Sequence, residues 1–249
     1  PGKAALADLV DKNRQAQWIV RAFLHFGGRN ISPERFFTDT INDVRRAVQC
    51  LRAFGVQNKS IWIELHNEVN LLPEGYGISW KSPSDFGVWL NSVLMLYRAA
   101  LPDLKYLYPG LSPGGDERSP DGTLLRRDAA AFLNGSRFVL DKVDGIGVHC
   151  YWQPAFPMSQ ALAHLDTYAG LGKPVWVTEA SNNKRTVPLP SAQDYASQYV
   201  AFLNHLRQRP WVYGVTYFVA SASNPTFQPE SWVSGGNSKG IARLVADAG

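Results

Sequence analysis

Short β-rich runs alternate with longer amphipathic runs along the whole chain, and this alternation limits the fold more than any other feature of the sequence. Six runs are rich in branched and aromatic residues, as strands are, and helix-like stretches separate them. Strands separated by a helix each time indicate βαβ units and a parallel sheet. We expect strands at residues 17–24, 60–68, 105–110, 144–152, 174–179 and 213–219.

Helices are expected between these strands and at both ends of the chain. Ser84 and Ser191 are the expected N-caps of two of them, because a serine side chain accepts hydrogen bonds from the first turn. The expected helices cover residues 3–14, 33–54, 84–101, 124–141, 159–171, 191–209 and 239–248.

The two faces of the second strand differ in polarity, and this favours a barrel over a doubly wound sheet. A doubly wound sheet is covered by helices on both sides and is apolar on both faces. A barrel meets helices only on its outer face, and its inner face opens into a site at the C-terminal ends of the strands. The apolar face carries Ile61, Ile63 and Leu65. The opposite, more polar face carries Trp62, Glu64, His66 and Glu68.

The expected fold is therefore α/β, of the (β/α)8 TIM-barrel type. A complete barrel has eight strands and only six units are recognisable, so the first two strands are missing or the barrel is incomplete. Barrels of about this length form one domain, and no linker divides the chain, so residues 1–249 are expected to form a single domain.

Composition narrows the classes of function. Charged residues make up 18% of the chain and no run of 20 apolar residues occurs, which argues against disorder and a membrane span. The net charge of +4 comes from scattered residues, whereas nucleic-acid-binding proteins concentrate it in a stripe. Cys50 and Cys150 show no zinc-site spacing and are expected as buried free thiols. We expect no cofactor, no metal, no nucleic acid and no membrane. The start, Pro1-Gly2-Lys3, has no initiator methionine or signal sequence, and neither compartment nor oligomeric state follows from the sequence.

Two glutamates stand out because each is expected to end a strand. Glu68 closes the second expected strand and Glu179 closes the fifth. Barrel enzymes place their reacting groups at the C-terminal ends of the strands. Retaining glycosidases need two carboxyl groups about 5–5.5 Å apart, one as acid/base and one as nucleophile. We therefore expect Glu68 and Glu179 to form a carboxylate pair in one carbohydrate-type active site.

Further side chains are expected around this pair. His149 and Tyr151 share the inward face of their strand and could each hydrogen-bond Glu179. Arg21 is a charge in an apolar strand and needs a carboxylate partner or a place in the site. His66 lies one inward step before Glu68, with a structural role as well supported as a functional one.

Trp152, Trp232 and Tyr217 lie near strand ends, where their rings could stack on a sugar, and Phe218 and Trp80 are further candidates. Trp62, Trp89 and Trp176 are expected in the core.

Three segments resemble motifs of the clan A retaining glycoside hydrolases. The run from Ile61 to Asn70 resembles the strand-four signature, in which Asn-Glu carries the acid/base. Residues 175–179 resemble the strand-seven nucleophile segment, and residues 148–152 resemble the strand-six His-x-Tyr motif. The set is similar to the β-xylosidase and α-iduronidase-like branch of the clan. The resemblance implies that Glu68 is the acid/base, Glu179 the nucleophile, and Asn67 the residue that holds the sugar 2-hydroxyl.

The sequence also departs from the clan pattern. Val69 replaces the usual proline after the acid/base. The last expected strand, residues 213–219, corresponds to the eighth strand of a complete barrel and contains no tryptophan. The leading hypothesis is a retaining glycoside hydrolase acting on an oligosaccharide or polysaccharide. A catalytically weak carbohydrate-binding relative on the same barrel is the alternative, and a metal-dependent barrel hydrolase using His66, His149 and a carboxylate is a third.

Overall fold

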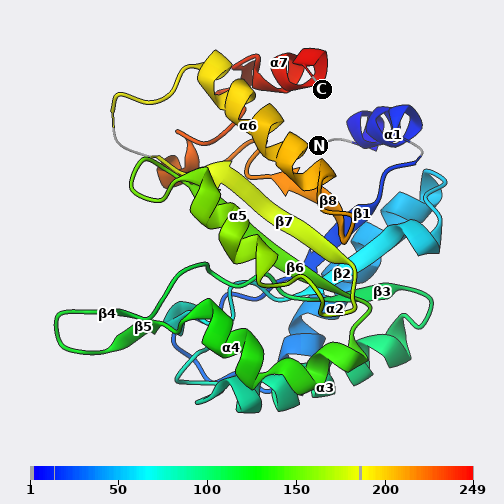
Figure 1. The fold of residues 1–249 in the computed structure, drawn as a ribbon. Helices are drawn as coiled ribbons and strands as arrows, with labels where there is room; N and C mark the ends of the chain where they lie inside the picture. The colour runs from blue at the N-terminus through cyan, green and yellow to red at the C-terminus, as the bar shows by residue number, and fades with distance from the viewer. Residues whose placement is uncertain (1–2, 14, 185–186, 249) are drawn as a thin grey trace. The chain divides into compact units, whose positions relative to one another are not determined.

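The computed structural model describes residues 3–13, 15–184 and 187–248, and it contains all six expected parallel strands (Figure 1). Their order in the sheet is β1-β2-β3-β6-β7-β8 and never reverses, as in a singly wound barrel rather than a doubly wound sheet. The pairings β1–β2, β2–β3, β3–β6 and β7–β8 are parallel. This confirms an α/β fold of the TIM-barrel type with six strands. The strands are β1 (Trp18–Ala22), β2 (Ile61–Leu65), β3 (Lys105–Tyr108), β6 (Gly145–Trp152), β7 (Val175–Asn182) and β8 (Val212–Tyr217).

The helices follow the expected alternation, and one expected helix is wrong. Residues 124–141 were expected as a single helix, but they form strand β5, a short helix and a 3-10 helix, η3 (Arg137–Lys142). The run cannot stay helical because residues 124–126 pair with β4 (Glu117–Arg118). The α-helices are α1 (Lys3–Lys12), α2 (Pro33–Ala53), α3 (Pro83–Ala100), α4 (Ala129–Gly135), α5 (Met158–Asp166), α6 (Ala192–Arg207) and α7 (Ile241–Ala248).

One expected N-cap is confirmed and the other is wrong. Ser191 caps α6, where its hydroxyl accepts from the Asp194 amide at 3.1 Å and the Asp194 carboxylate accepts from the Ser191 amide. This reciprocal arrangement satisfies two amides that the helix leaves free. Ser84 is not a cap, because α3 begins one residue earlier at Pro83 and Ser82 caps it. Proline suits the first helical position, where no amide hydrogen is needed.

The chain divides into two compact units, Pro1–Gly147 and Val148–Gly249, and each is described by itself. In the first unit, α2 packs against α3 and α3 packs against α4 (Figure 1). Its core is a cluster of aromatic rings between these helices and β2, built from Phe26, Phe36, Trp80, Phe86 and Trp89. The single domain expected from the sequence stays a prediction.

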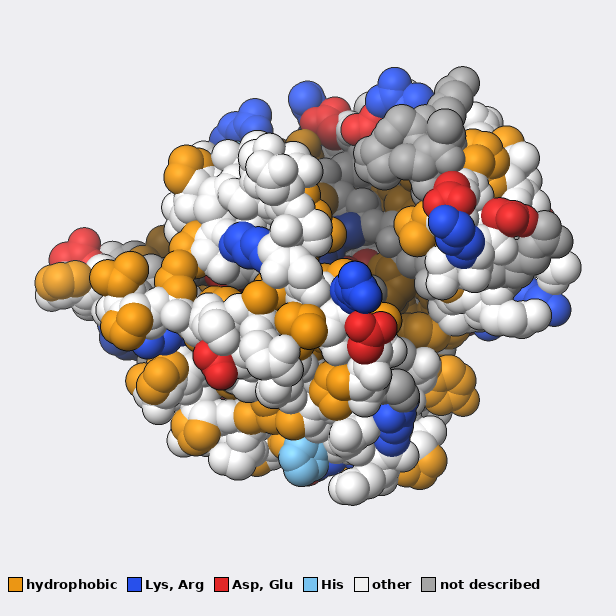
Figure 2. Space-filling model, turned by 90° about the horizontal axis from the view of Figure 1, so that it is seen from above, with side chains coloured by type: hydrophobic (Ala, Val, Ile, Leu, Met, Phe, Trp, Pro, Cys, Tyr) orange, Lys and Arg blue, Asp and Glu red, His pale blue; other side chains and the backbone are white. Residues whose placement is uncertain are grey.

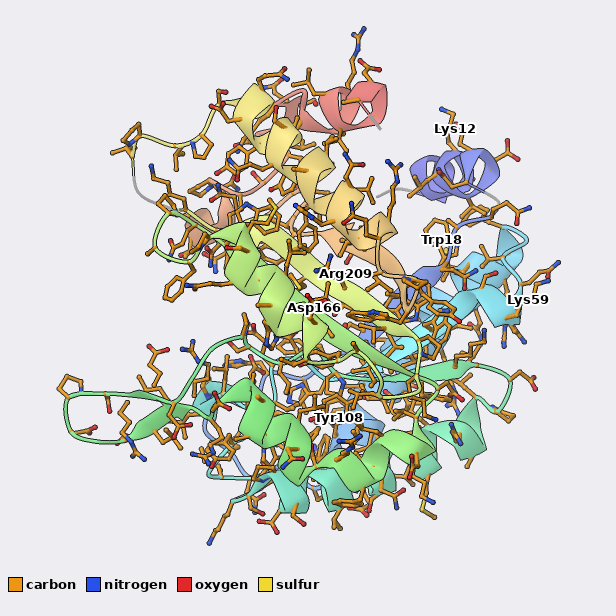
Figure 3. The ribbon with its side chains drawn as sticks, viewed as in Figure 1. Lys12, Trp18, Lys59, Tyr108, Asp166 and Arg209 are labelled. Carbon is orange, nitrogen blue, oxygen red and sulfur yellow. The ribbon has the colours of Figure 1, made fainter. Side chains whose placement is uncertain are left out.

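In the second unit, α6 packs against α7, β7 and β8. The rings of Trp152 and Phe202 stack with centroids 5.0 Å apart and form part of its core. A two-pronged ion pair joins the end of α5 to the turn after α6, since Arg209 donates from Nε and Nη2 to Asp166 at 2.7 and 2.8 Å (Figure 3). These hydrogen bonds lower the pKa of Asp166.

The surface carries charges of both signs. On the face shown in Figure 2, lysine and arginine side chains are interspersed with aspartate and glutamate. Among the described residues, every helix is too short or too polar to cross a bilayer. The remaining short elements are η1 (Asn58–Ser60), η2 (Leu72–Glu74), η4 (Pro225–Phe227), β9 (Val233–Ser234) and β10 (Asn237–Ser238).

Candidate active site

Glu68 lies in a turn after β2 and not at the end of the strand, which corrects the sequence expectation. The strand ends at Leu65, and both His66 (φ 83°) and Glu68 (φ 41°) have left-handed backbones. Residues other than glycine rarely adopt this conformation, which costs about 1–3 kcal/mol and is found mainly at functional sites. The alternation of faces therefore stops at Leu65. The Glu68 amide donates to the Gly110 carbonyl at 2.9 Å and its carbonyl accepts from the Leu71 amide at 2.9 Å, so the turn is held on both sides.

Two asparagines flank Glu68 and Val69 in this turn. Oδ1 of Asn67 is enclosed and has no hydrogen-bond partner among the residues that the structure describes. A buried acceptor without a donor is uncommon, and a ligand hydroxyl would satisfy it. Asn70 is fully buried, and its side-chain amide exchanges hydrogen bonds with both backbone groups of Ser112 and donates to the Arg127 carbonyl, all at 2.9 Å. Asn70 therefore ties the Glu68 turn to the segment after β3.

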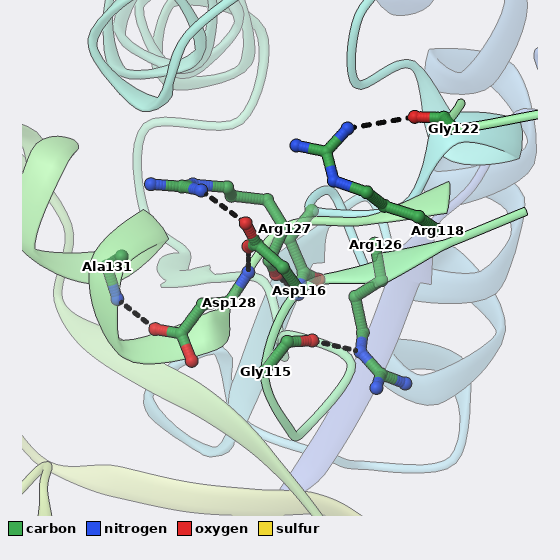
Figure 4. Close-up of polar contacts among 9 residues, drawn as sticks. Gly115, Asp116, Arg118, Gly122, Arg126, Arg127, Asp128 and Ala131 are labelled. Atoms are coloured by element: carbon green, nitrogen blue, oxygen red, sulfur yellow. Dashed lines mark hydrogen bonds and ion pairs between the residues drawn. The ribbon is translucent and has the colours of Figure 1, made fainter. Parts of the chain in front are cut away.

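The segment after β3 is itself held by a carboxylate, as Figure 4 shows. Asp116 accepts from Nη1 of Arg127 at 2.6 Å and from the Asp128 amide at 2.7 Å. The backbone hydrogen bond, with the Arg127 charge, lowers the pKa of Asp116. Asp128 in turn caps α4 by accepting from the Ala131 amide at 2.7 Å. The loop that receives Asn70 is therefore fastened to the start of α4.

Arg21 has the carboxylate partner that its place in an apolar strand requires. Its Nε donates to Glu64 Oε2 at 2.8 Å, directly across the β1–β2 pairing. The other oxygen of Glu64 accepts from the Gly110 amide at 3.1 Å, and the Glu64 side chain is 1% exposed. The other option for Arg21, a place among the substrate-binding residues of the site, stays a prediction beside the ion pair.

Replacing Arg21 with alanine is expected to lower the free energy of unfolding by about 3–5 kcal/mol, because Glu64 would be left charged and buried without its cation. The matched control is Arg46→Ala, which breaks an exposed ion pair with Asp43 and should cost less than about 1 kcal/mol. Urea unfolding followed by circular dichroism measures both. Equal losses for the two variants would contradict this reading of the Arg21–Glu64 pair.

His66 lies in the aromatic core of the first unit and is fully buried. Its ring stacks on Phe26 with centroids 4.6 Å apart, and Nε2 contacts the Glu74 carbonyl at 2.9 Å. Burial lowers the pKa of His66 to about 3, so the ring is neutral and Nε2 carries the proton that it donates. The ring has no access to solvent, which favours the structural role of His66, and its contact with a substrate stays a prediction.

Glu179 lies inside β7, three residues before its end, and not at the last position as expected. Its side chain is about 10% exposed. The Tyr151 hydroxyl donates to Oε2 of Glu179, and Nδ1 of His149 lies 3.6 Å from the same oxygen. Both contacts come from β6 in the same unit, as the shared face of His149 and Tyr151 predicts. A donated hydrogen bond favours the ionised form of a carboxyl group, the form that a nucleophile needs.

Four of the aromatic residues expected to stack on a sugar pack against other side chains of the protein, and their contact with a sugar stays a prediction. Trp152 ends β6, as the expected strand at residues 144–152 predicts, but it is only 3% exposed and its indole donates to Gln198 at 2.7 Å. Trp80 is also buried, at 1%. Trp232 and Tyr217 stack on one another at 5.7 Å and both contact Tyr199. These rings pack against the protein because apolar area is stabilised by removal from water. The burial of Trp62, Trp89 and Trp176 is confirmed.

Three other phenylalanines are better placed to meet a ligand, and two of them were missed. Phe218, one of the further sugar-stacking candidates, has its ring centroid 6.1 Å from that of Tyr151. Phe23 directly follows β1 with 45% exposure, and its ring lies 5.7 Å from that of His66. Phe156 is 58% exposed in the loop after β6. The signal for Phe156 was its position just past a strand, whereas Phe23 fell inside the strand expected at residues 17–24, which ends at Ala22. Among the residues described, no group of three or more His, Cys, Asp or Glu side chains could hold a metal ion.

The chain resembles glycoside hydrolases in part of its sequence and in its fold. Residues 131–239 match the family described as "Glycosyl hydrolase catalytic core", a range that includes His149, Tyr151 and Glu179. The chain is similar to an endo-β-1,3-glucanase of GH128 subgroup I from Amycolatopsis mediterranei in complex with laminaritriose, at 16% identity and a TM-score of 0.57, over 94% of this chain and 83% of that chain. This likeness shows the fold. No match is found among curated proteins.

Two further solved structures have the same fold. One is a GH128 subgroup II endo-β-1,3-glucanase from Pseudomonas viridiflava, at 17% identity and a TM-score of 0.54, over 92% of this chain and 78% of that chain. The other is an endo-β-1,4-glucanase from Xanthomonas axonopodis pv. citri, at 12% identity and a TM-score of 0.60, over the whole of this chain and 90% of that chain. The expected β-xylosidase and α-iduronidase-like branch receives no support from these glucanases.

Proposed function

We propose that this protein is a retaining glycoside hydrolase that cleaves a β-glucan by double displacement, with Glu68 as acid/base and Glu179 as nucleophile. The observation that carries the proposal is the Glu179 carboxylate, held in β7 by the Tyr151 hydroxyl with His149 beside the same oxygen. The left-handed backbone at Glu68 and the enclosed Asn67 oxygen support a reacting group in the turn after β2.

The comparisons support glycoside hydrolase activity and suggest the substrate. The family match covers the Glu179 segment, and the neighbours are endo-β-1,3- and endo-β-1,4-glucanases. Variants of the Amycolatopsis enzyme at two different glutamates are described with laminari-oligosaccharides bound. We therefore propose internal cleavage of a β-1,3- or β-1,4-linked glucan.

A mechanism-based label tests this assignment most directly. A 2-deoxy-2-fluoro oligoglucoside with a good leaving group forms the glycosyl-enzyme and slows its hydrolysis, so it marks the nucleophile. After digestion, mass spectrometry is expected to place the label on the peptide that contains Glu179. Laminarin and a β-1,4-glucan are assayed in parallel for reducing ends. Binding of the sugar without any label or hydrolysis would support the alternative, a binding relative on the same fold.

Replacing Tyr151 with phenylalanine is expected to lower kcat on a β-glucan about 10²-fold, because one preorganised donor to the nucleophile is removed. The matched control is Tyr195→Phe, since the buried Tyr195 hydroxyl in the same unit has no hydrogen-bond partner among the described residues. Steady-state kinetics of the two variants are compared. A Tyr151 variant as active as the Tyr195 variant would remove Tyr151 from the mechanism.

A further inference from the structure

The turn that holds Glu68 is fastened to one further segment, residues 71–80, which we call the Glu74 segment. His66 precedes Glu68 and donates from Nε2 to the Glu74 carbonyl at 2.9 Å. Val69 follows Glu68, and its carbonyl accepts from the Trp80 indole at 2.9 Å. With the bond from Leu71 to the Glu68 carbonyl, hydrogen bonds at three neighbouring positions connect the turn to this segment. The Glu74 segment therefore helps to hold the left-handed backbone at Glu68, together with Gly110 and Asn70.

The segment is packed closely against the aromatic core. Gly75 has a φ of 119°, and a Cβ built there would lie 2.7 Å from Trp80 Cη2 and 2.9 Å from Phe26 Cδ2. Only glycine fits this approach. The Gly75 carbonyl accepts from the Ser79 amide at 2.8 Å, which closes the segment on itself. The residue before Gly75 is thus held with little freedom.

Glu74 places a carboxyl group into this packed segment, and the mechanism proposed above does not use it. Its side chain is 14% exposed, and Oε2 is enclosed with no hydrogen-bond partner among the residues described. The His66 ring nitrogen is 4.0 Å away and already donates to the Glu74 backbone. Arg21 acts on it from β1 but is bound to Glu64, and the Glu68 charge opposes a second negative charge. His66 and Arg21 therefore do not neutralise a charge on Glu74, and Glu68 repels it.

We propose that Glu74 is a positioning residue for Glu68. While the Glu74 carboxyl is uncharged, the Glu74 segment stays packed in place. When this carboxyl ionises, the segment loosens and the turn that holds Glu68 is released. The proposal rests on the role given to Glu68 above and adds a pH dependence to it. It needs no contact between Glu74 and the substrate.

Ionisation has a defined direction and range. Burial, followed by the Glu68 charge, raises the pKa of Glu74 from 4.5 to about 7 in the folded protein. A group whose pKa is raised on folding contributes stability that is complete below its unfolded value. That contribution is lost as the pH rises towards the folded value. The segment should therefore be most stable below pH 4.5 and lose stability up to about pH 7.

Hydrogen exchange of the whole chain, read by mass spectrometry on peptides covering residues 66–80, tests this between pH 5 and pH 8. After correction for intrinsic exchange, the wild-type protection in these peptides is expected to fall by roughly 50- to 100-fold, the factor that a pKa change from 4.5 to about 7 gives between pH 5 and pH 8. Glu74→Gln keeps the shape without the charge and should keep its protection. Glu74→Ala also retains the backbone carbonyl that His66 contacts and should behave in the same way. Glu117→Gln removes an exposed carboxylate of the same unit and should follow the wild type.

Measuring activity against pH distinguishes the role proposed for Glu74 from the proposed function. In the wild type, kcat/KM on a β-glucan is expected to fall above about pH 7, and Glu74→Gln should move that limb upward by about one pH unit. Equal pH dependence of exchange in the wild type and both Glu74 variants overturns the role of Glu74, whatever the activity. A difference in exchange without hydrolysis by any variant leaves the segment mechanism standing and overturns the proposed function instead.

Discussion

Replacing Glu179 with alanine is expected to reduce turnover of a β-glucan and of an aryl β-glucoside by about 10⁵-fold. The carboxylate forms the covalent intermediate in a double displacement, and removal of a nucleophile costs rates of this order. Azide fills the space of the missing side chain and attacks from the same face. With the aryl substrate it should restore turnover and yield a glycosyl azide of inverted configuration.

Product configuration by nuclear magnetic resonance is the deciding measurement for this variant, and circular dichroism shows whether the fold is kept. The Tyr195→Phe protein serves as the folded, active reference from the same unit. An undiminished rate would show that Glu179 is not the nucleophile. A reduced rate with no effect of azide would leave Glu179 as a group that only orients the site.

Replacing Glu68 with alanine is expected to lower hydrolysis of a β-glucan about 10³–10⁴-fold, because the leaving sugar can no longer be protonated. Aryl glucosides with strongly acidic leaving groups need little protonation, so formation of their glycosyl-enzyme should fall far less. In this variant azide intercepts the glycosyl-enzyme on Glu179, and the glycosyl azide should have retained configuration.

The two azide products therefore assign the two glutamates independently. Kinetics across a series of aryl leaving groups measures the dependence on leaving-group pKa, which should be much steeper in Glu68→Ala than in the wild type. Glu117→Ala is the matched control, an exposed glutamate of the same unit that should keep the wild-type dependence. An inverted product from Glu68→Ala would exchange the roles of Glu68 and Glu179.

Local patterns were sufficient for most of the elements, with the helix expected at residues 124–141 as the exception. The six strands, the α6 cap at Ser191 and the buried tryptophans follow from strand propensity, capping chemistry and apolar periodicity, which act over a few residues. The two site residues whose predicted contact is confirmed, His149 and Tyr151, also follow from a local pattern. His149 and Tyr151 meet Glu179 because all three lie on regular strands, where alternation predicts the direction of a side chain.

The errors lie where regular structure ends. Glu68 was expected to point inward because the alternation of faces in β2 was extended past Leu65. The backbone leaves the strand at His66, where φ becomes positive. Trp152 and Trp80 were expected to face a sugar because they lie at or near the loops that follow the strands, yet both rings are buried. Burial of such a side chain depends on neighbours distant in sequence, such as Gln198 for Trp152. No local pattern contains that information.

The sequence alone determined the alternation of six strands and helices and singled out Glu68 and Glu179, because propensity, periodicity and motifs are properties of short segments. Only the tertiary structure decided how each glutamate is held. The donors to Glu179 come from β6, and the turn around Glu68 is fixed by Gly110, Asn70 and the Glu74 segment. A left-handed backbone at a glutamate is unfavourable locally, so it depends on contacts that exist only after the chain has folded.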